Sequence, residues 1–112
     1  MDDDLLATHV AELRRGTVVL ACLCVLGEAR YGYALLSTLE AAGFEVDGNT
    51  LYPLLRRLEK QGVLTSEWNT EESRPRKFYV LTEEGRSLRR ALAQEWSDLD
   101  VRVRTALEGS QS

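Results

Sequence analysis

Apolar residues recur at helical spacing through the first third of the chain. In residues 5 to 26 they follow one helical period, at Leu6, Val10, Leu13, Val18, Leu20 and Leu26. Gly27 then supplies a stop signal. In residues 31 to 43 a second apolar face, formed by Leu35, Leu36 and Leu39, ends at Gly43. The pattern predicts one long helix followed by a short one.

The period then changes. Phe44 and Val46 alternate with Glu45 and Asp47, which is typical of a brief, half-buried strand over residues 44 to 48.

A third helix is expected around Pro53. Because proline has no N–H and its ring clashes with the carbonyl four residues earlier, it is tolerated only in a first turn. The helix start is therefore placed at Asn49 or Thr50, with Thr50 as the preferred N-cap. A helix over about residues 50 to 61 has an apolar face of Leu51, Leu54, Leu55 and Leu58. Its outer flank then holds Arg56, Arg57 and Lys60.

The last third of the chain predicts a hairpin and a long helix. Residues 63 to 68 and 76 to 81 are rich in β-branched and aromatic residues, and turn formers join them, so a wing is expected over about residues 64 to 81. Thr82 is the expected N-cap of the last helix, with Glu83 and Glu84 in its first turn. From Gly109 onward the polar tail is expected to fray.

The last helix carries a narrow apolar seam. Its members alternate steps of four and three residues, at Leu92, Trp96, Leu99, Val103 and Ala106. This spacing of about 3.5 residues is typical of a helix that pairs with a partner helix. A chain of 112 residues also builds only a modest core. The seam therefore predicts a dimer.

This order of elements is that of a winged helix-turn-helix protein with an added C-terminal helix. The predicted fold is mainly α with a small β-hairpin (α+β). Residues 1–81 are expected to form a DNA-binding domain, and residues 82–112 a C-terminal dimerisation helix with a short tail. In such a fold the third helix enters the major groove, and the wing contacts the adjoining backbone or the minor groove.

Charge is distributed unevenly along the chain. The net charge is -4, yet residues 49 to 81 hold six Lys or Arg against four acidic residues, a balance of +2. The remainder holds eight against fourteen, a balance of -6. The positive part of the molecule is therefore the third helix with the wing, although a solvated helix face is the alternative explanation.

The candidate DNA contacts come from this positive part. Thr50, Tyr52 and Arg56 are expected at base edges or sugars, and the remaining cations at the phosphate backbone. Backbone N–H groups at the start of the helix are expected to hold a phosphate. The full set is Tyr31, Asn49, Thr50, Tyr52, Pro53, Arg56, Arg57, Arg74, Arg76 and Lys77.

Two details qualify this set. Tyr31 and Tyr33 stand two apart at the start of the second helix, so they are expected on different faces, with packing of both as the alternative to a phosphate contact. Glu71 and Glu72 at the wing tip repel phosphates, so the tip is expected to stay off the DNA.

The sequence offers little for catalysis. Cys22 and Cys24 point about 200° apart on a helix and cannot hold one metal ion together, so both are expected to be packing thiols. His9 has no partner at ligand spacing and is expected on a helix surface. Neither an enzyme, a metal nor a cofactor is predicted. No stretch approaches the roughly 20 apolar residues of a membrane span, and a cytoplasmic protein is expected.

Three segments resemble the PadR-like family of winged helix-turn-helix transcriptional regulators. They are YGYALLSTLE (31 to 40), GNTLYPLLRRLEKQG (48 to 62) and RPRKFYVLTEEG (74 to 85). The resemblance covers roughly residues 13 to 100. It implies a homodimeric winged-helix repressor in which the last helix of each subunit packs on the other subunit.

Trp96 has two interpretations. It anchors the dimer contact, or its two copies flank an apolar cavity where a flat aromatic or cationic effector stacks, as in some members of the family that the sequence resembles. The leading hypothesis is a ligand-responsive repressor that binds an inverted-repeat operator in double-stranded DNA. The alternative is a winged-helix adaptor that binds proteins and not DNA.

Overall fold

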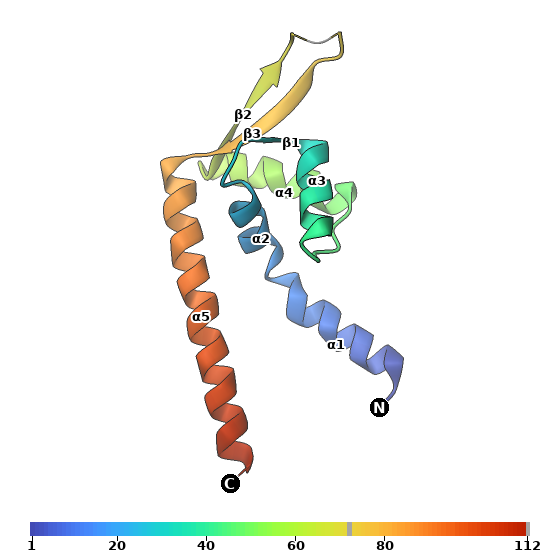
Figure 1. Cartoon of the computed structure of the whole chain (residues 1–112), viewed down its shortest axis with the longest axis vertical. Helices are drawn as coiled ribbons and strands as arrows, with labels where there is room; N and C mark the ends of the chain where they lie inside the picture. Colours follow the sequence, from blue (N-terminus) through green and yellow to red (C-terminus); the bar gives the residue numbers. More distant parts are fainter. Residues whose placement is uncertain (72, 112) are drawn as a thin grey trace.

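The computed structural model describes residues 1–71 and 73–111. In order along the chain, the elements are α1 (Asp3–Arg15), α2 (Val18–Val25), β1 (Arg30–Tyr31), α3 (Gly32–Ala41), α4 (Gly48–Lys60), β2 (Leu64–Asn69), β3 (Arg76–Leu81) and α5 (Glu83–Gln111). Helices α2, α3 and α4 pack together at the base of a small sheet, whose hairpin projects from one end (Figure 1). Helices α1 and α5 extend from the opposite side and diverge. The expected fold class is confirmed.

Leucines of three helices and the hairpin base form the core. The largest fully buried side chains are Leu23, Leu26, Leu35, Leu39, Leu51, Leu55, Leu58, Leu64 and Cys22. The four leucines expected on the inner face of α4 are all buried. Their burial removes apolar surface from water, and this holds α4 against α3 and β2.

The hairpin follows the sequence prediction. Strands β2 and β3 are antiparallel, with Leu64 opposite Leu81 at the base and Asn69 opposite Arg76 at the outer end. The sheet order is β1-β3-β2, and Tyr31 of β1 lies opposite Phe78.

The expected strand at residues 44 to 48 is wrong, and the additional strand is β1 instead. Gly43 adopts a φ of 94°, and the Phe44 N–H donates to the Leu39 carbonyl at 2.9 Å, closing the end of α3. The Phe44 backbone is thus used to end the helix. The alternation that suggested a strand reflects instead the packing of Phe44 and Val46 against the core.

The single first helix expected over residues 5 to 26 is also wrong. It is divided into α1 and α2 at Gly16 and Thr17. Thr17 donates both its N–H and its hydroxyl to the Arg14 carbonyl, at 2.9 and 2.6 Å. These bonds satisfy a carbonyl at the end of α1 and let the chain turn.

Helix α4 begins earlier than expected, with Asp47 as its N-cap. The Asp47 carboxylate accepts a hydrogen bond from the Thr50 N–H at 2.9 Å, so the expectation of Thr50 as the cap is wrong. Pro53 lies inside the helix and leaves the Asn49 carbonyl without its helical donor. Asn49 is exposed, so water can satisfy that carbonyl.

Helix α5 is anchored at its first turn. Thr82 caps it as expected, accepting from the Gly85 N–H at 3.0 Å and donating to the Gly62 carbonyl at 2.6 Å. A Cβ at Gly85 would collide with the Val63 carbonyl oxygen, which explains the glycine there. The helix continues to Gln111, past Gly109, where the sequence suggests the start of the tail, and fraying of that end stays a prediction.

The two cysteines have different environments. Cys22 is fully buried, and burial raises the pKa of its thiol to about 11. Cys24 is exposed, so the expectation that both thiols pack inside is wrong for Cys24. The reason is their angular separation around α2, which turns one outward when the other is buried. His9 lies exposed on α1 as expected. No helix of the described chain is long and apolar enough to cross a membrane.

Candidate nucleic-acid interface

The outer flank of α4 is cationic. Arg56, Arg57 and Lys60 are all exposed, and within residues 1–71 and 73–111 none of them forms an ion pair. Arg57 and Lys60 lie in the last turn, where they also complement the negative end of the helix. The flank therefore presents positive charge to solvent from a rigid element.

The start of α4 is less suited to an anion than expected. Thr50, Asn49 and Pro53 are exposed there, but the Asp47 carboxylate takes the Thr50 N–H. A phosphate would meet a negative charge and one fewer free donor at this end. The Thr50 N–H is therefore already used by the cap, and phosphate binding at this terminus stays a prediction.

Tyr52 fills a slot between the starts of α3 and α4. A Cβ at Gly32 would lie 2.8 Å from the Tyr52 Cε1, and one at Gly48 would lie 3.2 Å from its Cε2. The ring thus needs glycine on both sides, and it is 36% exposed. Tyr52 packs between α3 and α4, and part of its side chain stays exposed.

Lys77 at the wing base is tied to α4. Its Nζ lies 3.7 Å from Oε1 of Glu59, whose Oε2 accepts a hydrogen bond from the Ser66 hydroxyl at 2.7 Å. The Nζ also lies 5.7 Å from the ring centroid of Tyr79. Burial, and after it the charge of Glu59, raises the pKa of Tyr79. Lys77 thus joins β3 to α4, which the sequence did not predict.

Tyr31 and Tyr33 stack on each other, contrary to the expectation that they lie on different faces. Their ring centroids are 5.8 Å apart with an interplanar angle of 11°. The expectation fails because Tyr31 is extended backbone before α3, in β1, and only Tyr33 is helical. The Arg76 guanidinium lies over the Tyr33 ring, 4.8 Å from its centroid.

The outer hairpin carries further exposed groups. Arg74 and Glu71 are exposed, and Glu72 lies outside the described residues. Trp68 on β2 is 63% exposed, a surface aromatic that sequence reasoning did not single out. Its position at the outer end of a predicted strand could have indicated that it is exposed.

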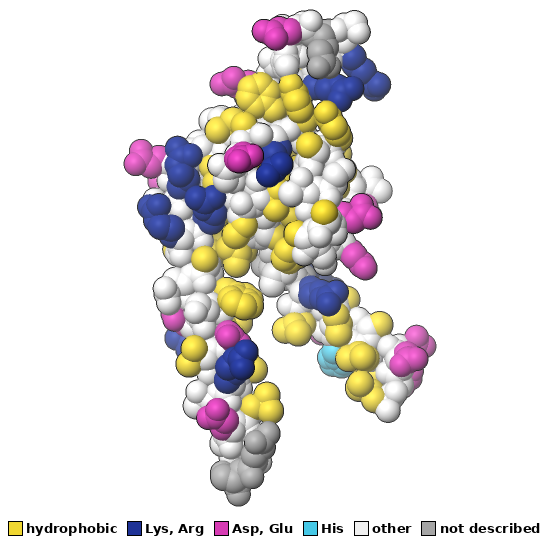
Figure 2. Space-filling model, in the orientation of Figure 1, with side chains coloured by type: hydrophobic (Ala, Val, Ile, Leu, Met, Phe, Trp, Pro, Cys, Tyr) yellow, Lys and Arg dark blue, Asp and Glu magenta, His cyan; other side chains and the backbone are white. Residues whose placement is uncertain are grey.

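Positive side chains gather in two areas of the face shown in Figure 2. One group lies beside the outer hairpin, and the other lies beside the junction of the hairpin with α5. Hydrophobic side chains lie on the hairpin between them, interspersed with charged and other side chains.

Helices α1 and α5 carry unpacked apolar side chains. Trp96 is 54% and Leu99 55% exposed, and Val103 is exposed too, whereas Leu92 packs against the chain's own core. No residue of α1 is buried, although it holds Leu5, Leu6 and Leu13. Figure 2 shows hydrophobic side chains along both helices.

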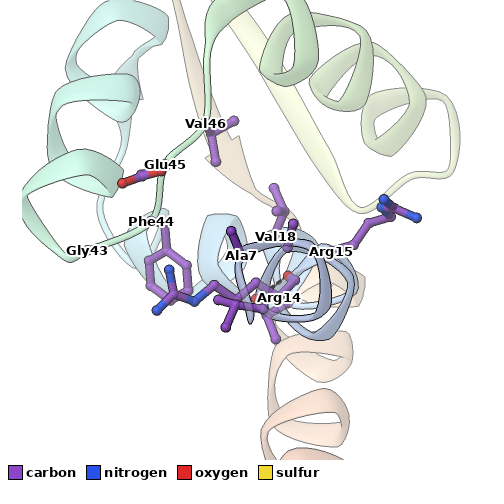
Figure 3. A pocket seen from close by; sticks show the side chains of 11 residues that line it. Ala7, Arg14, Arg15, Val18, Gly43, Phe44, Glu45 and Val46 are labelled. Carbon is purple, nitrogen blue, oxygen red and sulfur yellow. Dashed lines mark hydrogen bonds between the residues drawn. The ribbon is translucent and has the colours of Figure 1, made fainter. Parts of the chain in front are cut away.

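A groove of about 430 Å³ lies between α1 and the segment that follows α3. Figure 3 shows Ala7 and Arg14 of α1 on one side, with Phe44, Glu45 and Val46 on the other. The groove does not involve Trp96, so it is distinct from the effector cavity expected between two copies of Trp96, which stays a prediction.

Three core helices followed by a β-hairpin define a winged helix-turn-helix protein. Residues 20–91 match the Transcriptional regulator PadR-like family, and the chain belongs to this family. It is a transcriptional regulator and not an enzyme.

Relatives agree with this assignment. The chain is 37% identical over 79 residues to the transcriptional regulator Rv3488 of Mycobacterium tuberculosis, covering 70% of this chain and 71% of that protein. The crystal structure of a PadR family transcriptional regulator from Eggerthella lenta has a TM-score of 0.90 and 47% identity, with 95% of each chain covered. A PadR-like transcriptional regulator from Bacillus cereus has a TM-score of 0.76 and 26% identity, covering 86% of this chain and 96% of that one.

Proposed function

We propose that the protein is a homodimeric repressor that binds an inverted-repeat operator with one α4 helix in each half-site. The supporting observation is the division of α4 into a buried leucine face and an exposed flank with Arg56, Arg57 and Lys60. A rigid helix whose cations form no ion pair with any residue of 1–71 and 73–111 is suited to the major groove, where arginine reads guanine and lysine neutralises phosphate. Arg74 and Arg76 of the wing contact the adjoining backbone.

The proposed dimer forms through α1 and α5. The apolar side chains of α1 and of the outer part of α5 lie outside the core, and each helix thus carries exposed apolar surface of a kind that marks a protein interface. A two-fold dimer of this kind presents two α4 helices to DNA, which accounts for an inverted repeat. The α5 seam that remains for the partner is Trp96, Leu99, Val103 and Ala106, because Leu92 packs against the core of its own chain.

Ligand response is proposed to act at this dimer contact. An indole that is 54% exposed offers a face on which a flat aromatic or cationic ligand stacks. Such a ligand between two copies of Trp96 shifts the spacing of the α4 helices and releases the operator.

Selection of bound sequences from random double-stranded DNA tests the proposal. We expect an inverted repeat, bound by two chains per site with a dissociation constant on the order of 10⁻⁸ M or tighter at moderate salt. Selection of direct or single half-sites would contradict the dimer geometry. Recovery of no preferred sequence would favour the protein adaptor.

A further inference from the structure

Four side chains form a continuous column on one side of the hairpin. Phe78 meets the edge of Tyr31 with ring centroids 5.9 Å apart and an interplanar angle of 77°. Tyr31 stacks on Tyr33, and the Arg76 guanidinium covers the opposite end of the column at 4.8 Å from the Tyr33 centroid. Because Arg76 and Phe78 are two apart on β3, they point to the same face of the sheet. The column therefore joins two positions of β3 through β1 and α3.

The column is also bonded to the other strand of the hairpin. The Asn69 side-chain amide donates to the Tyr31 hydroxyl at 2.6 Å, and Asn69 lies opposite Arg76 in the β2–β3 ladder. Tyr31 thus contacts the hairpin at Phe78 and at Asn69. The Tyr33 ring stacks on Tyr31, and the Arg76 guanidinium in turn stacks on the Tyr33 ring.

A fixed guanidinium matters at a DNA contact. An unrestrained arginine loses rotamer freedom when it binds a phosphate, so an arginine that is already held in one orientation binds with a smaller entropic loss. Tyr33 is 53% exposed, and its ring contributes to the column and not to the core.

We propose that Tyr33 is a positioning residue for DNA binding, whose ring holds the Arg76 guanidinium toward the phosphate backbone. This inference rests on the proposed DNA-binding function. Tyr33 acts through Arg76, and its hydroxyl is not needed.

Substitutions that separate the ring from the hydroxyl test the proposal. Tyr33→Leu should weaken binding to all DNA sequences by about two- to fivefold per subunit, the equivalent of an exposed cation–π contact. Tyr33→Phe keeps the ring and should bind like the wild type. In an Arg76→Leu background, Tyr33→Leu should cause no further loss, because the two residues act as one unit. The proposal is overturned if Tyr33→Phe and Tyr33→Leu lose the same amount of DNA affinity. It is also overturned if Tyr33→Leu weakens binding as much in the Arg76→Leu background as in the wild type.

A measurement on the free protein separates this inference from the proposed function. The Arg76 Hδ proton resonances should be shifted upfield by the Tyr33 ring in the wild type and in Tyr33→Phe, and the shift should vanish in Tyr33→Leu. If the wild type lacks the shift but binds its operator, the positioning role is wrong and the DNA-binding function stands. If the shift is present but the wild type binds no double-stranded DNA, the proposed function fails and the positioning role fails with it.

Discussion

Lys77 of β3 lies 3.7 Å from the carboxylate of Glu59 on α4. This ion pair spans the junction between the wing and the helix proposed to enter the major groove. Both side chains are about one third exposed, so the pair is partly screened by solvent. Its main consequence is geometric: Lys77 is directed toward α4, and a carboxylate is placed among the cations of the interface.

Glu59→Gln should strengthen binding to DNA of any sequence. The substitution removes a negative charge and releases Lys77, while the Gln carbonyl can still accept the Ser66 hydroxyl. If Lys77 then contacts a phosphate, the slope of log affinity against log salt should steepen by about 0.9 per subunit. Glu67→Gln is the matched control, since it makes the same charge change at an exposed position of β2. Identical salt slopes for the two variants would show that Glu59 does not restrain Lys77.

Asp47→Ala should lower the free energy of unfolding by about 0.5–2 kcal/mol, the usual cost of losing an N-cap. Asp47→Asn keeps an equivalent acceptor and should be close to the wild type. Thr50→Ala should change the stability by less than about 0.5 kcal/mol, because Thr50 contributes its backbone N–H and not a cap. Urea unfolding measures all three. If Thr50→Ala lowered the free energy of unfolding more than Asp47→Ala, the N-cap would be Thr50 and not Asp47.

Trp96→Ala combined with Leu99→Ala should convert the proposed dimer into monomers. Deleting large side chains that become buried on association costs about 2–5 kcal/mol for each. Sedimentation at micromolar concentration gives the mass directly. Trp68→Ala removes the other exposed tryptophan, on the hairpin, and should leave the dimer intact. A wild-type protein that sediments as a monomer is incompatible with the proposed interface.

The two thiols should react at very different rates. With a thiol reagent at pH 8, Cys24 should react rapidly, whereas Cys22 should react only on unfolding, because it is buried with its pKa raised to about 11. Cys24→Ser should abolish the rapid phase. Since the folded-state pKa is raised, the contribution of Cys22 to stability is present below pH 9.0 and is lost as the pH rises toward about 11. Equal native-state rates for both thiols would contradict the burial of Cys22.

The sequence predicted those elements whose determining residues all lie within the element itself. The i, i+3, i+4, i+7 leucines of α4, the hairpin and the Thr82 cap all lie where the sequence places them. Asp47 and Thr50 are both good cap residues, and the sequence alone does not decide between them. The two-residue strand β1 forms only because β3 lies beside it, which no local pattern contains.

The candidate site was predictable in its charges and not in its contacts. The exposure of Arg56 and Arg57 follows directly from the leucine face of α4. The pairing of Lys77 with Glu59 joins residues far apart in the sequence, and it depends on how α4 packs against β2. The stacking of Tyr31 on Tyr33 was missed because both were assigned to one helix, where residues two apart diverge.

The salt dependence of operator binding by Arg56→Ala combined with Arg57→Ala tests the central claim most directly. The control is the double variant Arg102→Ala with Arg104→Ala, which removes the same charge from the far part of α5. Sedimentation first verifies that this control variant is still a dimer. The account predicts that the α4 variant loses most of its operator affinity. Its slope of log affinity against log salt should become shallower by about 0.9 for each phosphate contact removed, while the affinity and slope of the α5 variant change little. Equal losses for the two variants would contradict it, because net charge and not the cationic flank of α4 would then govern binding.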